Sequence, residues 1–280
     1  MDMLDVVSCL PWPLPLSVLV WAVQMAVFHC AGLFFEWSDR TGMLASFKVR
    51  DVDRLGYFEL LPRVLANQVF ILLPAMAVLQ YTGLAFTGAP HLSVLHFFAG
   101  MALMGIGHDI VQYVFHRFVL HRPGLIRRLG HSVHHSTGAS KAISACYMSP
   151  ADFFLEIVLP YLVPLALAGA GADVSFHLTV ACLGAIGGLY EHSGYDFAVR
   201  LRPPNGSGSR PLAWLSHLAT SKAHGEHHRR SNVSFSDGFG SPGICDTICR
   251  TRWDMAEPAE KARSPVHGAG AERARARHRS

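Results

Sequence analysis

The sequence predicts an all-α integral membrane protein, with about four to five transmembrane helices and a histidine-rich helical cap on the cytosolic side. Three observations support this fold class. Half of the 280 residues are hydrophobic and only 16% are charged, which is too apolar for an ordinary soluble domain. The Lys and Arg residues are confined to separate blocks between long apolar stretches. The chain also contains 17 histidines, and this combination is typical of a membrane protein that binds metal.

Five segments are apolar enough to cross a bilayer, since a spanning helix needs roughly 20 apolar residues. They cover residues 12–35, 64–87, 92–116, 151–170 and 174–191. The first has no basic region before it and is longer than the apolar core of a signal peptide, so we expect a retained anchor. Prolines crowd its start, which leaves open whether it spans fully or lies in the membrane interface.

The chain divides into three regions on this basis. Residues 1–35 form the N-terminal membrane anchor and 36–256 the main membrane domain, in which 36–63 is expected to be a loop with short interfacial helices. Residues 257–280 are rich in Ala, Arg, Glu, Pro and Gly without periodicity, which predicts a disordered tail.

The basic residues predict the orientation in the membrane. Five of the 24 Lys and Arg lie in 40–63, five in 117–141 and fourteen in 200–279. The short connections near residues 83–91 and 170–174 have none. If those two turns face outside, every basic block faces the cytosol, as the positive-inside rule requires. Long gaps without basic residues also argue against a nucleic-acid-binding protein.

Nine histidines form a pattern near the predicted cytosolic ends of the spans. They comprise one HxxxxH pair, two HxxHH boxes and a single histidine after the fifth span, namely His116, His121, His131, His134, His135, His224, His227, His228 and His192. On a helix, positions i, i+3 and i+4 lie on one side, so each HxxHH box presents three imidazoles together. Nine nitrogens would serve two metal ions with four or five ligands each. Imidazole suits Fe, Zn, Cu and Ni, so the spacing does not choose the metal.

The other histidines are interpreted more simply. We expect six to be ordinary surface or core residues, namely His29, His91, His96, His177, His267 and His278. His108 and His217 lie nearer the boxes but outside them. Asp109 and Tyr113 fall seven and three residues before His116, so either side chain is a candidate to hydrogen-bond that ligand.

Other chemistries lack a motif. HGEHH is not the HExxH of zinc proteases, and the chain has no GxSxG elbow and no P-loop. A metal transporter would place ionisable ligands near the middle of the membrane, whereas the boxes follow the spans. A non-enzymatic membrane metal-binding protein remains the alternative class.

These motifs resemble the fatty acid hydroxylase/sterol desaturase superfamily. The similarity extends from about residue 35 to 255 and is closest to the C4-methyl sterol oxidase (methylsterol monooxygenase) branch. DIVQYVFHRFVLH, from Asp109 to His121, is similar to the first box of that branch, and EHSGYDF around His192 is similar to its H-S-G-Y-E-F. The chain departs from the family in the last box, where Gly225 and Glu226 replace an Asp-Tyr pair.

The resemblance implies that the nine box histidines bind two iron ions (Fe²⁺). It further implies that the protein uses O2 to hydroxylate or oxidise an unactivated C–H group, preferably a methyl, of a sterol or related lipid. A lipid desaturase or a fatty-chain hydroxylase are the alternatives within the superfamily. Electrons must come from an external NAD(P)H-dependent donor such as cytochrome b5 or a ferredoxin, since the chain has no redox cofactor motif. The expected location is the endoplasmic reticulum membrane in a eukaryote, or the cell membrane in a bacterium.

Overall fold

The computed structural model describes residues 14–52, 55–200, 216, 219–236 and 241–255. Within these ranges the chain is helical, without any strand. Five helical segments are long and apolar enough to cross a membrane, which confirms the all-α membrane fold. They are Leu16–Thr41, Tyr57–Tyr81, Val94–Leu120, Pro150–Leu167 and Val174–His192. The predicted tail 257–280 and His217 lie outside the described residues.

Each span is built from one or more labelled elements. The first is α2 (Leu16–Thr41), and the fifth is α10 (Val174–His192). The second joins α3 (Tyr57–Asn67), η2 (Gln68–Leu72) and α4 (Leu73–Tyr81). The third joins α5 (Val94–Phe115) and η3 (His116–Leu120). The fourth joins α8 (Pro150–Phe153), η5 (Phe154–Val158) and α9 (Leu159–Leu167).

The expectation of a loop over 36–63 was wrong at both ends. Helix α2 continues to Thr41 and ends where Gly42 adopts a positive φ of 69°, a left-handed conformation that favours glycine. Helix α3 already begins at Tyr57, where the Glu59 carboxylate accepts a hydrogen bond from the Gly56 N–H at 2.7 Å. Charged residues near the ends of the spans therefore made the predicted helices too short, because local capping and not hydropathy sets their ends.

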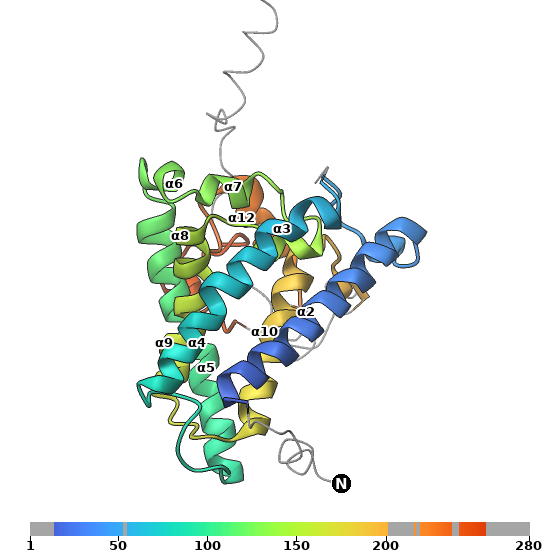
Figure 1. Ribbon diagram of the computed structural model, residues 1–280. Coiled ribbons are helices and arrows are strands. Elements are labelled where there is room, and N and C mark those ends of the chain that lie inside the picture. Colours follow the sequence, from blue (N-terminus) through green and yellow to red (C-terminus); the bar gives the residue numbers. More distant parts are fainter. Residues whose placement is uncertain (1–13, 53–54, 201–215, 217–218, 237–240, 256–280) are drawn as a thin grey trace, which may run out of the picture.

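The spans pack into a bundle, in which α2 lies against α10 and α4, and α5 lies against α9 (Figure 1). Two glycines of α5 allow the closest approaches. A Cβ at Gly107 would come within 2.5 Å of Pro164 on α9, and one at Gly100 within 2.8 Å of Phe176 on α10. Small residues at such crossings let helix backbones approach closely, which is the usual way that membrane helices associate.

Three of the spans contain a wide turn with i+5 hydrogen bonding, which is the π-helical form. Two of these turns, η2 and η5, are followed two residues later by Pro74 and Pro160. A proline inside a helix removes a hydrogen bond to residue i−4 and crowds that carbonyl, which a wider turn relieves.

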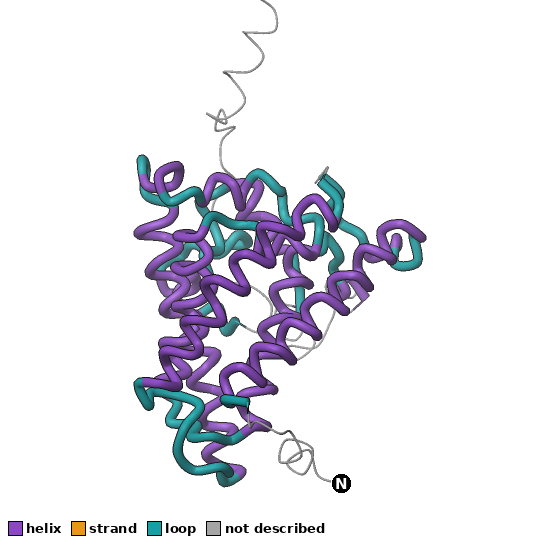
Figure 2. Tube along the Cα trace, in the orientation of Figure 1, coloured by secondary structure: helices purple, strands orange, loops and turns teal. Residues whose placement is uncertain are grey.

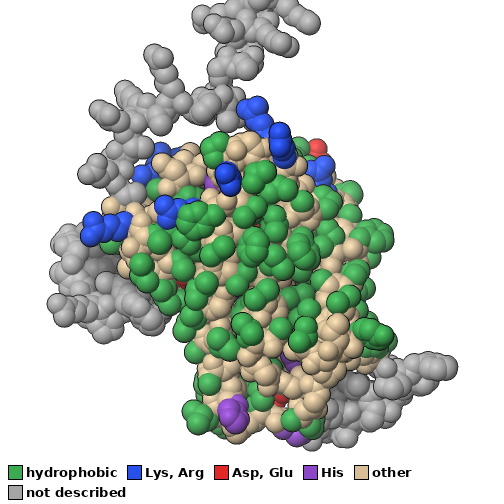
Figure 3. All heavy atoms as spheres, turned by 90° about the vertical axis from the view of Figure 1, so that its left-hand side faces the viewer, with side chains coloured by type: hydrophobic (Ala, Val, Ile, Leu, Met, Phe, Trp, Pro, Cys, Tyr) green, Lys and Arg blue, Asp and Glu red, His purple; other side chains and the backbone are tan. Residues whose placement is uncertain are grey.

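The short helices gather at one end of the bundle (Figures 1 and 2). They are α6 (Leu125–Arg128), α7 (His131–His135), η4 (Ala142–Cys146), α12 (Lys222–Arg230) and α13 (Ile244–Ile248), with η1 (Ala45–Phe47) and η6 (Phe197–Arg200) in the connecting segments. On the face shown in Figure 3, the Lys and Arg side chains gather at the end where α6 and α7 lie. The Lys and Arg residues that the structure describes on this face therefore lie at the same end of the molecule as the box helices α7 and α12.

Candidate metal centre

The structure brings all nine box histidines together, in two adjacent clusters at the capped end of the bundle. Cluster A consists of His116, His121, His131, His135 and His227. Cluster B consists of His134, His192, His224 and His228. Within each cluster the potential ligand atoms all lie within 4.8 Å of one another.

The spacing in cluster A is that of ligands around one ion. Neighbouring Nε2 atoms are 2.9 Å apart between His131 and His121, 3.2 Å between His116 and His131, and 3.1 Å between His121 and His227. His135 Nε2 lies 3.2 Å from that of His121. Nitrogens that share a metal at about 2.1 Å are roughly 3.0 Å apart at right angles. These atoms therefore have the separation that a common ion requires.

Cluster B is similar but less evenly spaced. His192 Nε2 lies 3.2 Å from that of His134 and 2.9 Å from that of His224. Both ring nitrogens of His228 are buried without a hydrogen-bond partner within the described part of the chain. A buried imidazole left in this way loses its hydration without compensation, which a bound metal would supply.

Each HxxHH helix divides its three histidines between the clusters. In α7, His131 and His135 belong to cluster A while His134 belongs to cluster B. In α12 the pattern is reversed, because His224 and His228 belong to cluster B and His227 to cluster A. At about 100° per residue, positions i and i+4 differ by about 40° around the helix, whereas i+3 points about 60° the other way. The sequence predicted the shared helix side correctly but not this division.

The HxxxxH pair meets in cluster A because of a π turn. His121 N–H donates to the His116 carbonyl at 2.9 Å, five residues back, which places the two residues one turn apart on the same side of η3. A regular α-helix would separate side chains with this spacing. The spacing of five is thus a sequence signal for the wide turn, and such turns are frequent at functional sites.

Hydrogen bonds at the outer ring nitrogens fix the orientation of several rings. Nδ1 of His116 donates to the Phe235 carbonyl at 2.7 Å, and Nδ1 of His227 donates to the Val233 carbonyl at 2.7 Å. His192 Nδ1 donates to the Gly188 carbonyl at 3.0 Å. Because a carbonyl can only accept, Nδ1 carries the hydrogen and the Nε2 lone pair faces the cluster. This arrangement around a metal-binding histidine raises its basicity as a ligand.

The environment favours neutral imidazoles, which are the form that binds metal. Burial and the neighbouring imidazoles lower the pKa of the box residues that lie outside the spans, to about 4 for His227 and well below the ordinary value for His134, His224 and His228. His131 is the exception. Burial opposes its protonation, but the Glu156 and Asp152 carboxylates outweigh burial and raise its pKa to about 10.

Two carboxylates of the fourth span, Asp152 and Glu156, therefore belong to the site, although they were not among the residues predicted from the sequence. Asp152 Oδ1 accepts a hydrogen bond from His131 Nδ1 at 2.9 Å, and Glu156 Oε2 lies 3.2 Å from the same nitrogen. Both side chains are almost fully buried, with exposed fractions of 0% and 2%. Acidic residues four positions apart in an otherwise apolar span are costly and usually functional, and that signal was available in the sequence.

The structure does not place Asp109 or Tyr113 against His116, so that expectation was wrong. The Asp109 carboxylate accepts hydrogen bonds from Ser241 Oγ at 2.9 Å and from the Ile244 and Cys245 N–H groups at 3.0 Å. Tyr113 Oη lies 3.2 Å from Thr251 Oγ1 and also contacts Arg117. Both side chains hold the segment around α13 against α5, and the His116 ring is instead oriented by Phe235.

Arg50 connects three of the elements that carry ligands, and it too went unnoticed in the sequence. Its guanidinium donates to the carbonyls of Ala139 at 3.0 Å, Glu191 at 2.8 Å and Ser221 at 3.0 Å. The Ala139 carbonyl lies just after α7, and the Ser221 carbonyl lies just before α12. The Glu191 carbonyl lies in α10, next to His192. Gly225 in α12 leaves the space for the guanidinium, because a Cβ there would overlap it.

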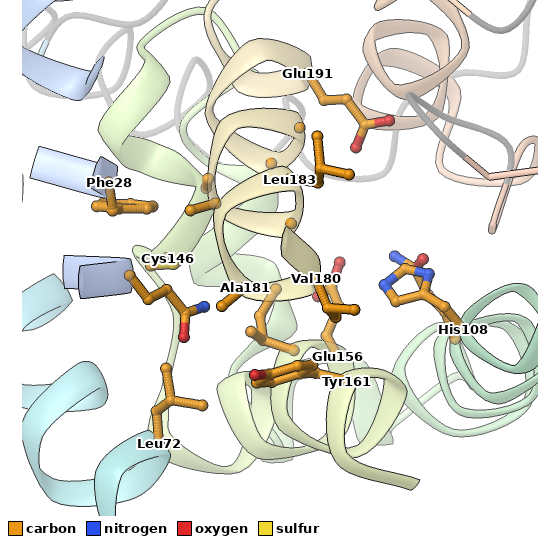
Figure 4. A pocket seen from close by; sticks show the side chains of 18 of the residues that line it. Phe28, Leu72, His108, Cys146, Glu156, Tyr161, Val180, Ala181, Leu183 and Glu191 are labelled. Atoms are coloured by element: carbon orange, nitrogen blue, oxygen red, sulfur yellow. The ribbon is translucent and has the colours of Figure 1, made fainter. Parts of the chain in front are cut away.

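An apolar pocket of about 480 Å³ extends from His192 and His224 of cluster B into the bundle, and Figure 4 shows part of its lining. Its walls include Phe28, Leu72, Tyr161 and Val180, and His192, His224 and Glu156 line it as well. His108 also lines the pocket without joining either cluster. The volume and mostly apolar lining are those of a small-molecule site.

The remaining histidines behave as ordinary residues where the structure describes them. His29 contacts Tyr57 Oη at 2.7 Å and Gln68 Oε1 at 2.9 Å, and His177 Nε2 donates to the Gly171 carbonyl at 3.1 Å. His96 is exposed near Ser93, and His91 is exposed. His267 and His278 lie outside the described residues.

Comparison with known proteins identifies a family that this chain matches. The model of the fatty acid hydroxylase family matches residues 101–251, just over half of the chain, including all nine clustered histidines. No curated protein and no solved structure matches. The family implies oxidoreductase activity of the membrane hydroxylase or desaturase type, and it is typically iron-dependent. The chain belongs to the fatty acid hydroxylase family.

Proposed function

We propose that this protein is a membrane-bound non-haem diiron oxygenase that acts on a lipid. Clusters A and B would each hold one iron ion. The substrate would be a sterol or related lipid, oxidised at an unactivated C–H group, preferably a methyl, with O2 and electrons from an external donor. The observation that supports this most directly is the pair of adjacent buried imidazole clusters at an apolar pocket in the bundle.

The residues of the chain fit a metal centre of this kind. The Nε2 spacing matches that of metal ligands, and carbonyl acceptors orient the rings. Bound iron would supply the activation of O2 needed to attack an unactivated C–H bond. The pocket walls would bind the apolar substrate, exclude water and position one of its carbon atoms near His192, His224 and Glu156.

The electron donor would dock at the end of the bundle where the short helices α6, α7 and α12 lie. The segment between the ligands His121 and His131 exposes Arg122, Arg127 and Arg128. An acidic electron carrier such as cytochrome b5 or a ferredoxin would meet complementary charge on this segment, which joins two ligands of cluster A. The positive-inside rule would place this end in the cytosol.

Metal analysis and turnover test the proposal. Protein purified after iron-replete expression should contain close to two iron ions per chain. The metal-free protein would be reconstituted anaerobically with iron, then given O2, a reductant system and membrane lipids, with products identified by mass spectrometry. Gain of an oxygen atom supports hydroxylation, whereas loss of two hydrogens identifies a desaturase.

A matched histidine variant serves as the control. His96→Ala removes an exposed imidazole of α5 that lies outside both clusters, so it should retain metal and activity. His134→Ala should bind less metal than the wild type and should lose turnover. A wild-type protein that holds no transition metal would overturn the proposal, and metal without turnover on any lipid would favour a non-enzymatic metal-binding protein.

A further inference from the structure

Glu156 lies between the two histidine clusters. Its Oε1 atom is 3.7 Å from His116 Nε2 of cluster A and 3.8 Å from His134 Nε2 of cluster B. Its other oxygen, Oε2, is 3.2 Å from Nδ1 of His131. The side chain is buried and also lines the apolar pocket, where Figure 4 labels it. One carboxylate thus contacts both clusters and the pocket.

The charge of the proposed centre calls for an anion at this position. The nine imidazoles are neutral ligands, so two divalent ions would bring four positive charges into a buried region. Such a charge requires nearby compensation in a region of low dielectric constant. Within the described residues, the carboxylates grouped with these histidines are Asp152 and Glu156. Asp152 contacts the outer nitrogen of His131, which leaves Glu156 as the carboxylate between the clusters.

The local backbone explains why Glu156 points inward. It lies in the wide turn η5, and Pro160 four residues later cannot donate the helical hydrogen bond to the Glu156 carbonyl. Residues four apart lie on one side of a helix, and Asp152 and Glu156 accordingly both face His131. The sequence PADFFLEIVLP thereby specifies a carboxylate at the centre of the site.

We propose that the Glu156 carboxylate is a ligand shared by the two metal ions. Two atoms bound to one ion at about 2.1 Å are roughly 3.0 Å apart at right angles and roughly 4.2 Å apart when opposite. The separations of Oε1 from His116 Nε2 and from His134 Nε2 fall between these limits. This inference rests on the proposed dimetal centre. The competing interpretation gives Glu156 the same role as Asp152, which is to orient His131 alone.

Cobalt titration separates the two interpretations. Metal-free full-length protein in detergent would be titrated with Co²⁺, followed by the visible absorption of the bound ion and by calorimetry. The wild type should bind two ions. Glu156→Gln keeps the size of the side chain but removes its charge, and it should weaken both sites by more than about 100-fold. Asp152→Asn is the matched control, because it alters only the hydrogen bond to the outer nitrogen of His131. Loss of such a contact typically weakens metal binding about 10–100-fold, and the effect should be limited to cluster A.

Electron paramagnetic resonance of the dicobalt protein gives a second readout. Exchange coupling between the ions should be present in the wild type and in Asp152→Asn but lost in Glu156→Gln. If the Gln variant does not fold, judged by circular dichroism and a single elution peak, Glu156→Asp replaces it. That shorter carboxylate cannot reach both clusters, so it should also lose the coupling.

The outcomes distinguish the two proposals. A wild type that binds no cobalt overturns the dimetal centre itself. A wild type with two ions, beside a Glu156→Gln variant with unchanged affinity and coupling, overturns only the shared ligand. Loss of a single ion in that variant also overturns it, because Glu156 would then serve one cluster alone.

Discussion

Replacing Gly225 with alanine adds one methyl group to α12, the helix that carries three of the nine histidines. In an ordinary helix this change stabilises the folded protein by about 1 kcal/mol, because glycine is a poor helix former. Here the new Cβ would overlap the guanidinium of Arg50. The arginine must then leave the carbonyls of Ala139, Glu191 and Ser221, so the effect of the change should reverse sign.

The magnitude follows from those three hydrogen bonds. A hydrogen bond to a charged group contributes about 1.5–3 kcal/mol. Arg50 is only half-buried, so water replaces part of the loss and the total falls to about 2–4 kcal/mol. Subtracting the gain in helix propensity leaves a net destabilisation of about 1–3 kcal/mol. Because α12 also holds ligands of both clusters, metal affinity should fall in parallel.

Thermal unfolding in detergent measures the effect. A loss of about 2 kcal/mol lowers the Tm of a protein of this size by roughly 4–8 °C. Gly105→Ala in α5 is the matched control, because a Cβ there meets nothing within 4 Å and should not destabilise the protein. In an Arg50→Ala background, Gly225→Ala should become stabilising, with a coupling energy of about 2–4 kcal/mol in the double-mutant cycle. A higher Tm for the single Gly225→Ala variant would refute this account of the contact.

Three further predictions concern the clusters and the bundle. His227→Ala should lose the ion of cluster A, and His134→Ala should lose the ion of cluster B. Metal analysis of either variant should find about one ion, and neither should turn over substrate, since a dimetal reaction needs both ions. Full activity in either variant would contradict the site assignment. The metal-free protein should lose stability as pH falls below about 6.5, because imidazoles whose folded pKa is lowered, such as His227 at about 4, bind protons more readily when unfolded. That stability is present above pH 6.5 and is lost toward pH 4, and a flat profile of Tm against pH would count against buried neutral imidazoles. Gly107→Leu should destabilise by about 1–3 kcal/mol, because its side chain would overlap Pro164 where α5 packs on α9; Gly105→Leu, facing open space, should not.

Much of the fold was predictable from hydropathy and charge. The five spans appear where long apolar runs predicted them, because apolar length alone decides which segments enter a bilayer. Their ends were less predictable. Helix α3 begins at Tyr57, seven residues before the predicted start at 64, since a capping contact of Glu59 and not hydropathy sets that boundary.

The candidate site was predictable only in its most regular part. The six histidines of the two HxxHH boxes were identified by their spacing, because an unusual residue type repeated at helical intervals is visible in the sequence. His192 was selected for its place after the fifth span. Asp152 and Glu156 were missed although they are intramembrane acids, and Arg50 was missed because it acts on backbone carbonyls, which leave no sequence signature. Asp109 was assigned to His116 by its spacing, but its carboxylate is satisfied by backbone N–H groups near α13.

The sequence by itself therefore predicted a membrane protein of about four to five spans with nine histidines near one end, since composition and periodicity are local properties. Only the tertiary structure decided how those histidines divide into two clusters. In each HxxHH helix the histidines at i and i+4 belong to one cluster and the histidine at i+3 belongs to the other. Each cluster is completed by histidines from distant segments, such as His116 in cluster A and His192 in cluster B. It also decided that Glu156 stands between the clusters, because a contact across helices depends on packing that no single segment contains.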